Sequence, residues 1–226
     1  MFDEVNLFPL FLSLRVALTA TLFAFIIGVP IAYYLNRSKS RSADIIDTFI
    51  TLPIVLPPTV LGYYLLVLLG RQSSIGAFLE DNFNITIVFT PTGAVIAALV
   101  VSIPFLIKSA KSAFAWIDPA LLQAARVLGR SEFNIFITIM LPLAWRGILA
   151  GVTLAFARAL GDFGATLMVA GSIPNETMTM PIAIYDALLA GNQELANILV
   201  IIMTAVSVSV LYIINRLEKR MTRGRE

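Results

Sequence analysis

Two oppositely charged residues, Arg158 and Asp162, lie four positions apart in an otherwise apolar part of this 226-residue chain. On a helix, positions i and i+4 are neighbours on one face, so the two side chains can pair. An acid C-terminal to a base is the poorer orientation for such a pair, so a partner on another helix is the alternative for each residue. Ionisable groups within apolar spans are rare and usually turn away from lipid. The pair is either a self-neutralising structural element, a gate latch, or a site that meets an anionic substrate.

The residue types that carry most covalent and metal chemistry are absent from the sequence. It has no cysteine and no histidine, which excludes a thiolate nucleophile, a disulfide, a histidine base and the usual zinc site. No Gly-Lys dipeptide occurs, so the chain lacks the phosphate-binding loop G-x-x-x-x-G-K-[ST]. We therefore expect no enzyme, no cofactor and no metal site, and any ATP that drives the protein must be hydrolysed by another subunit.

A charged segment, residues 118–142, interrupts the apolar sequence. Asp118 followed by Pro119 is typical of a helix N-cap with proline at the first helical position. Gly129 is typical of the left-handed residue that ends a helix, and a further helical segment follows it. The sequence therefore predicts an amphipathic helix pair held at the membrane surface.

The composition predicts a membrane protein. The chain is 58% hydrophobic and 13% charged, with a mean hydropathy of +0.88, whereas an average soluble domain is about 25% charged. A helix needs roughly 20 apolar residues to cross the hydrocarbon core of a bilayer. We predict an all-α polytopic membrane protein with one domain over residues 10–216, whose five transmembrane helices are 16–35, 46–70, 91–115, 143–164 and 194–215.

Two features of the apolar segments leave alternatives open. Pro57 and Pro58, together with Pro53, are predicted to break the second span. This break is either a packing kink or an unwound segment that lines a pathway. The apolar stretch 164–171 is too short to cross the membrane, so it is expected to form a re-entrant turn or an interfacial helix.

The lysines and arginines indicate an orientation. Thirteen of the 16 fall just after the first span, in or beside the charged segment, or at the C-terminal end. Cytoplasmic loops carry an excess of these residues. We therefore expect the N-terminus outside, the C-terminus in the cytoplasm, and the charged segment on the cytoplasmic side, where ATP is available.

The charged segment resembles the cytoplasmic EAA loop of type I ABC-importer permeases. In that family the pattern is Glu-Ala-Ala, three residues, Gly, nine residues, Ile, one residue, Leu-Pro. Every spacing is kept here, with glutamine in place of the first glutamate, at Gln123, Ala124, Ala125, Gly129, Ile139, Leu141 and Pro142. The resemblance implies the type I importer permease fold, and a coupling helix that docks into a cleft of an ATPase subunit and transmits its motion.

Residues 52–66 and 156–185 resemble the corresponding stretches of bacterial molybdate ABC transporter permease subunits. The resemblance implies a multi-pass protein of the bacterial cytoplasmic (inner) membrane that translocates molybdate as a homodimer. Besides lipid, its partners would be two copies of an ABC ATPase subunit and a periplasmic or extracellular oxyanion-binding protein, with no nucleic acid. Tungstate or sulfate is the alternative substrate. A secondary transporter and an integral membrane enzyme are the alternative classes.

Overall fold

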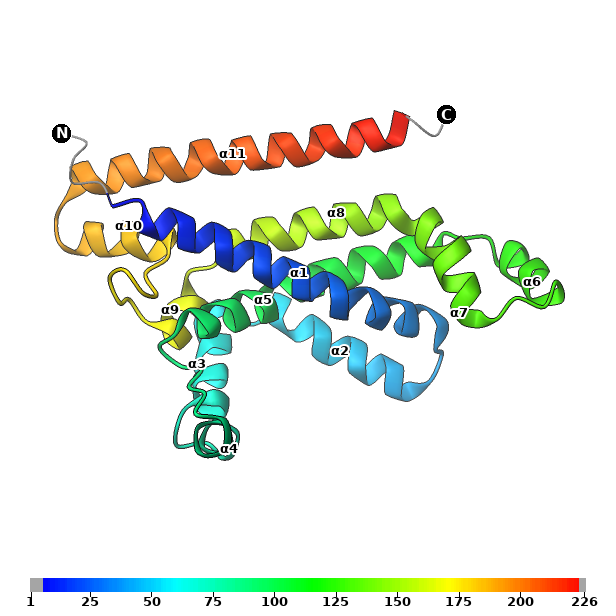
Figure 1. Cartoon of the computed structure of the whole chain (residues 1–226), viewed down its shortest axis with the longest axis horizontal. Helices are drawn as coiled ribbons and strands as arrows, with labels where there is room; N and C mark the ends of the chain where they lie inside the picture. The colour runs from blue at the N-terminus through cyan, green and yellow to red at the C-terminus, as the bar shows by residue number, and fades with distance from the viewer. Residues whose placement is uncertain (1–5, 224–226) are drawn as a thin grey trace.

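The computed structural model of the protein describes residues 6–223. These residues form helices joined by turns and short loops, with no strand among them (Figure 1). In chain order the helices are α1 (Phe8–Arg37), α2 (Arg41–Val55), α3 (Pro58–Leu69), α4 (Ser74–Phe83), α5 (Pro91–Ala115), α6 (Pro119–Val127), α7 (Glu132–Ile135), the π-helix η1 (Phe136–Met140), α8 (Leu141–Leu160), α9 (Gly164–Ala170), α10 (Met180–Leu189) and α11 (Gln193–Arg223).

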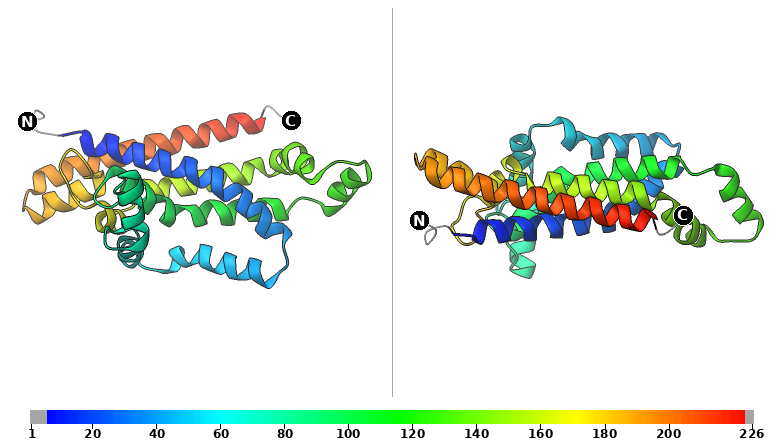
Figure 2. Two further views of the ribbon diagram at one scale, coloured as in Figure 1. Left: turned by 60° about the horizontal axis from the view of Figure 1, so that its bottom comes forward. Right: turned by 90° about the horizontal axis from the view of Figure 1, so that it is seen from above.

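Three long helices, α1, α5 and α8, pack side by side at the centre of the molecule (Figures 1 and 2). Small side chains at their contacts let the backbones approach closely, which is how helices associate where water supplies no driving force. At Gly147 of α8, an added Cβ would lie only 2.4 Å from the Cβ of Ala113 of α5. Several alanines of α1 and α5 are completely buried, among them Ala17, Ala20, Ala24, Ala94, Ala97 and Ala98.

The predicted second span, 46–70, is divided into two helices. α2 ends at Val55, α3 begins at Pro58, and the two are bent by 118°. The break that the prolines predict is therefore present, but Pro53 lies inside α2 and does not interrupt it. α3 leaves the direction of the long helices and projects from the bundle with α4 (Figure 1). α2 and α3 together make a fifth span only if a helix broken in this way is counted as one span.

Four long apolar helices correspond to the other predicted spans. α5 has the predicted bounds, 91–115. α1 begins earlier than predicted because Pro9 provides a favourable first turn, and α8 ends earlier than predicted, at Leu160. Residues 132–160 form a single helical run through α7, η1 and α8. The charged segment is thus joined to a membrane span without a flexible connection.

The long helices give the molecule two ends (Figure 1). One end holds the last turn of α1 together with α6 and α7, and the other holds α9, α10 and the first turns of α1. The basic segments 37–41 and 126–130 consequently lie at the α6 end.

The stretch 164–171 contains the seven-residue helix α9. Its residues Gly164, Ala165 and Val169 are buried, and the helix packs against α3 and α5. Gly171, with a φ of 71°, ends it. The backbone of this short helix is therefore shielded by protein, as its polar groups require at membrane depth.

Candidate coupling surface and gate

The helix α6 begins and ends at the residues that the sequence indicates. The Asp118 carboxylate accepts a hydrogen bond from the backbone N–H of Ala120 at 2.8 Å. At the other end Gly129 has a φ of 77°, its N–H donates to the Arg126 carbonyl, and the N–H of Arg130 donates to the Ala125 carbonyl. These are the two bonds of a Schellman motif. An added Cβ at Gly129 would meet nothing within 4 Å, so the positive φ is what requires glycine.

The two faces of α6 differ sharply. Ala125 is 6% exposed and Leu122 is partly buried, and both pack against the hydrophobic core. Ala125, although part of the Glu-Ala-Ala-like pattern, therefore faces its own chain. Four large apolar side chains on the outside of the loop are exposed to solvent: Leu121 (45%), Val127 (88%), Leu128 (81%) and Phe133 (76%). We call these four residues the outer apolar surface.

A carboxylate ties this loop to the end of α1. Glu132, the first residue of α7, accepts a hydrogen bond from Arg126 Nε at 2.8 Å and forms an ion pair with Arg37. Arg37 also donates to the hydroxyl of Tyr33 at 3.0 Å. The hydrogen bonds from Arg126 and Arg37 lower the pKa of the Glu132 carboxyl from its ordinary value of 4.5, so Glu132 is charged at neutral pH. Glu132 of α7 thus links Arg126 of α6 to Arg37 of α1 in one network of charged side chains.

Aromatic rings pack beneath this charge network. Tyr33 of α1 lies 4.6 Å from Phe136 and 6.1 Å from Phe114, measured between ring centroids. These separations are typical of favourable aromatic contacts. Phe114 lies in the last turn of α5 and Phe136 begins η1. The three rings therefore join the end of α1, the end of α5 and the start of η1.

The last three residues of the EAA-like pattern lie where η1 gives way to α8. Pro142 has no N–H, and its ring would crowd the carbonyl four residues before it in a regular helix. The N–H of Leu141 instead bonds to the carbonyl of Phe136, five residues back, as in a π-helix. Ile139 and Leu141 are partly buried against the core. These residues of the EAA-like pattern therefore lie at the junction where the π-helix η1 continues into α8.

The pair predicted from Arg158 and Asp162 is formed. Arg158 Nη1 donates to Asp162 Oδ1 at 3.2 Å, and the Asp162 side chain is completely buried. The second carboxylate oxygen accepts from the N–H and the hydroxyl of Thr166 at 2.9 and 2.8 Å. Sequence reasoning missed Thr166, although it is again four positions on. Asp162 therefore neutralises Arg158 and holds the first turn of α9.

The prolines of the second span lie next to this pair through α9. An added Cβ on Gly164 would lie 3.1 Å from the Thr59 side chain and 3.3 Å from that of Pro58, so α9 packs directly on the start of α3. Pro57, just before, is exposed. The four pathway candidates, Pro57, Pro58, Arg158 and Asp162, therefore gather around α9, away from the EAA-like residues.

A second charge cluster, near the end of α5 that leads into the charged segment, was not predicted. Asp47 of α2 accepts hydrogen bonds from Lys108 and Lys111 of α5, both at 2.8 Å. The available signals were an acid at the start of the second predicted span and two lysines three positions apart, hence on one face, in the third. The pairing of segments more than 60 residues apart depends on the fold.

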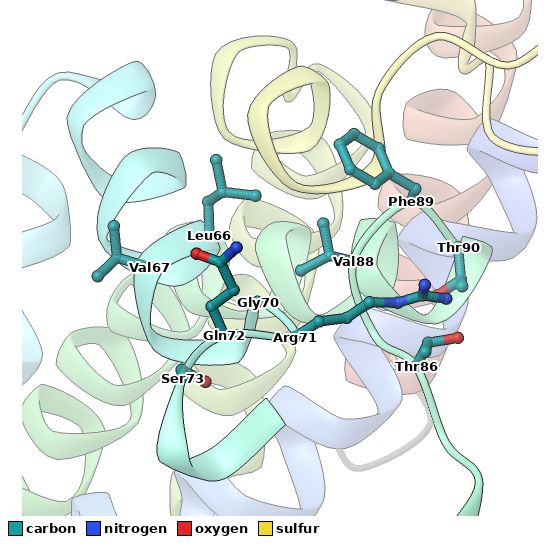
Figure 3. Close-up of a pocket in the computed structure, with 10 residues that line it drawn as sticks. All are labelled: Leu66, Val67, Gly70, Arg71, Gln72, Ser73, Thr86, Val88, Phe89 and Thr90. Atoms are coloured by element: carbon teal, nitrogen blue, oxygen red, sulfur yellow. The ribbon is translucent and has the colours of Figure 1, made fainter. Parts of the chain in front are cut away.

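One pocket lies between the end of α3, the start of α4 and the segment before α5. It has a volume of about 880 Å³, and Arg71 extends across it toward Thr90 (Figure 3). Arg71 is the only cation among the lining residues and lies 3.5 Å from Glu80. The pocket is therefore nearly neutral, which makes it a poor anion site.

A bundle of helices long and apolar enough to cross a membrane, with an amphipathic helix at one end, is typical of the membrane subunit of a transporter. The chain belongs to the family described as binding-protein-dependent transport system inner membrane component, whose model matches residues 20–223. It is a transmembrane subunit and not an enzyme, as predicted. Membership of this family favours an importer permease over the secondary transporter and the membrane enzyme.

Several relatives are similar to this chain over most of its length. The molybdenum transport system permease protein ModB of Escherichia coli (strain K12) is 45% identical over 77% of this chain and 76% of its own length. ModB of Azotobacter vinelandii is 37% identical over 81% of either chain. YvgM of Bacillus subtilis (strain 168) is 43% identical over 92% of both.

Solved structures confirm the fold. The methionine ABC transporter MetNI in an inward facing conformation matches with a TM-score of 0.74 at 17% identity, over 99% of both chains. A bacterial alginate ABC transporter in complex with a pentasaccharide-bound periplasmic protein matches with a TM-score of 0.74 at 16% identity, over 98% of this chain and 83% of that chain. The predicted type I importer permease fold is therefore correct.

Proposed function

We propose that this permease translocates molybdate across the cytoplasmic membrane and that α6 is the coupling helix through which an ATPase subunit drives it. The observation that carries the coupling role is the outer apolar surface at the head of an unbroken helical run, 132–160. Apolar side chains exposed at a charged end of a membrane protein favour a protein partner. Gln123 and Ala124 are exposed beside them, within reach of the same partner.

The orientation follows from the same end of the molecule. The basic segments 37–41 and 126–130 lie at the α6 end, and the positive-inside rule assigns that end to the cytoplasm. The N-terminus is then outside and the C-terminus inside, as the sequence predicts. This orientation presents α6 to the compartment that contains ATP.

We further propose a homodimer of this chain above two ATPase copies, loaded from outside by an oxyanion-binding protein. Only 6% of the apolar stretch of α11 is buried within the chain. α3 also exposes large side chains, namely Tyr63, Tyr64, Val67 and Leu68. These surfaces suit lipid and a second copy. In this assembly the ATPases draw the two copies of α6 together when they close, and α8 carries that movement to Arg158 and Asp162 near α9.

Molybdate is favoured as the substrate because the ModB relatives carry molybdenum transport in their names and are 37–45% identical to this chain. No residue of the described structure separates molybdate from tungstate or sulfate by its chemistry. We therefore assign the selection among oxyanions to the binding protein. The permease supplies the gated path.

Transport in proteoliposomes tests this proposal. The chain is reconstituted with its ATPase and its binding protein, and ATP-dependent uptake of molybdate is measured in the presence of excess tungstate or sulfate. We expect saturable molybdate uptake that tungstate inhibits more strongly than sulfate. Uptake of sulfate in preference to molybdate would assign the permease to the alternative substrate, and uptake without ATP would contradict the coupling role.

A further inference from the structure

The Asp47 cluster has one more cation than it has acids. Lys108 Nζ donates to one oxygen of the Asp47 carboxylate and Lys111 Nζ to the other, each at 2.8 Å. In the described part of the chain, Asp47 is the only carboxylate that forms an ion pair with either ammonium group. The cluster therefore carries one net positive charge between α2 and α5.

This charge lies within a membrane-spanning helix. Lys108 is seven residues before the end of α5 at Ala115, which corresponds to roughly 10 Å along the helix axis. A lysine at that depth could reach the interface by extending along the helix, yet Lys108 turns instead toward Asp47, whose side chain is only 20% exposed. The side chains of Lys108 and Lys111 are 39% and 33% exposed. Ionisable groups within a span mark candidate functional sites.

Lys108 also faces an open groove between α2, α5 and α8. The groove has a volume of about 610 Å³ and is lined by Lys108 and by the hydroxyl residues Ser109 and Ser112. Ala144 and Gly147 form its floor on α8, and Trp116 borders it. The Ser109 hydroxyl already donates to the Gly147 carbonyl at 2.8 Å. The Lys108 ammonium group and the Ser112 hydroxyl are therefore the groups that can donate hydrogen bonds to an oxyanion in the groove.

The two lysines are not equivalent. Lys111 shares Asp47 but is not among the residues that line the groove. An ammonium group has three donors, and the bond to Asp47 uses one of them on Lys108. If Lys108 turns to a ligand in the groove, Lys111 still neutralises Asp47, so no bare carboxylate is left in the span. Lys108 can therefore change partners at low cost.

We infer that Lys108 is a transient contact for a tetrahedral dianion on the inner section of the pathway, with Lys111 holding Asp47 while the exchange occurs. This inference rests on the proposed function, since it identifies where the translocated oxyanion meets the permease. Asp47 competes for Lys108, which keeps the contact weak and lets the anion leave. A fixed site of two free cations would retain a dianion instead.

A purely structural role predicts a different result from the same substitutions. If the cluster only fastens α2 to α5, Lys108→Gln and Lys111→Gln should lower molybdate uptake to a similar extent. Adding Asp47→Asn to either variant should then restore uptake equally. In an anion contact the two lysines differ. Lys111→Gln leaves Lys108 locked on Asp47, and adding Asp47→Asn releases it, whereas Asp47→Asn cannot restore a chain with Lys108→Gln.

The experiment measures ATP-dependent molybdate uptake by the reconstituted transporter for these variants at matched protein levels. We expect each single lysine variant to lower uptake about tenfold, the usual effect of one lost charged hydrogen bond. Lys111→Gln with Asp47→Asn should recover most of the uptake, and Lys108→Gln with Asp47→Asn should not. Lys39→Gln removes an exposed cation at the same end and serves as the control. Equal behaviour of the two double variants, or normal uptake by Lys108→Gln, would overturn the inference.

A binding measurement separates this inference from the proposed function. In a Trp145→Phe background, Trp116 is the only tryptophan and borders the groove, so its fluorescence can be titrated with molybdate. We expect a saturable change that Lys108→Gln abolishes and Lys39→Gln leaves intact. If the parent imports molybdate but Lys108→Gln does not alter the titration, the inference alone fails. If the parent imports no oxyanion, the proposed function fails, and the inference with it.

Discussion

Arg37, the last residue of α1, is paired with Glu132, the first residue of α7, although 95 residues separate them in the sequence. Glu132 holds Arg126 of α6 at the same time. The end of the first span and the helix proposed to meet the ATPase are thereby fixed to one carboxylate. In the proposed coupling mechanism, this carboxylate connects α6 to α1, in addition to the helical run that connects the loop to α8.

Glu132→Gln should weaken coupling without unfolding the protein. The amide keeps the shape of the side chain but removes the charge that binds Arg37 and Arg126, and exposed ion pairs contribute little to stability. We expect more ATP to be hydrolysed for each molybdate imported, with an unchanged melting temperature. Glu80→Gln, which removes an ion pair with Arg71 far from α6, is the control. An unchanged ratio would show that α1 is not driven through this carboxylate.

The same carboxyl sets a pH dependence. The pKa of Glu132 is lowered in the folded protein, so its contribution is complete above the ordinary glutamate pKa and is lost only as the pH falls below that value, through the folded pKa. We expect the ratio of ATP hydrolysed to molybdate imported to be constant between neutral and mildly acidic pH. A change in that range that Glu132→Gln abolishes would contradict this assignment.

Asp162→Ala should destabilise the protein more than Arg158→Ala. Loss of Asp162 leaves Arg158 without this partner and also frees the N–H and hydroxyl of Thr166, at a cost of about 3 kcal/mol. Loss of Arg158 leaves Asp162 with both bonds to Thr166. Thermal unfolding in detergent gives the order. Replacement of both residues should be milder than Asp162→Ala alone, and equal melting temperatures for the two single variants would refute the structural role.

Gly147→Ala should destabilise the contact of α5 with α8. The new methyl group would lie 2.4 Å from the Cβ of Ala113, and such overpacking costs about 1–3 kcal/mol. Ala113→Gly in the same chain should restore most of the loss. Gly161→Ala is the matched control, because its nearest neighbour would be at 3.5 Å. The measurement is the melting temperature in detergent of the parent, Gly147→Ala, Gly147→Ala with Ala113→Gly, and Gly161→Ala. If Ala113→Gly does not restore the melting temperature, the two helices are not in contact at this point.

The orientation can be checked by labelling, since the chain has no native cysteine. Lys39→Cys, exposed after α1, should react only from the cytoplasmic side, and Ser74→Cys, exposed at the start of α4, only from outside. A reagent that does not cross membranes is applied to intact cells and to inverted vesicles. Labelling of Lys39→Cys in intact cells would show that the proposed topology is inverted.

Features set by neighbours in the sequence could be predicted. The caps of α6 at Asp118 and Gly129 and the pairing of Arg158 with Asp162 involve residues only a few positions apart. The long spans could be predicted because an apolar run of roughly 20 residues has the length that a helix needs to cross a bilayer. The chain's family could be anticipated from the EAA-like spacing.

Features set by packing could not be predicted. Ala125 turns inward because it packs against the hydrophobic core. The sequence of a short amphipathic helix does not say which of its faces a neighbour covers. The prolines indicated a break but neither its position nor its angle: Pro53 stays inside α2, and α2 and α3 are bent by 118°. The pairing of Asp47 with α5 required the fold itself.

The central claim, that the outer apolar surface of α6 docks an ATPase and passes on its motion, is tested most directly by copurification. Leu121→Glu and Leu128→Glu each place a charge on that surface. Leu189→Glu places one on an exposed leucine of α10 at the opposite end. With the permease tagged, we expect the first two variants to lose the ATPase subunit and the third to retain it. Undiminished ATPase in the Leu121→Glu and Leu128→Glu preparations would contradict the account.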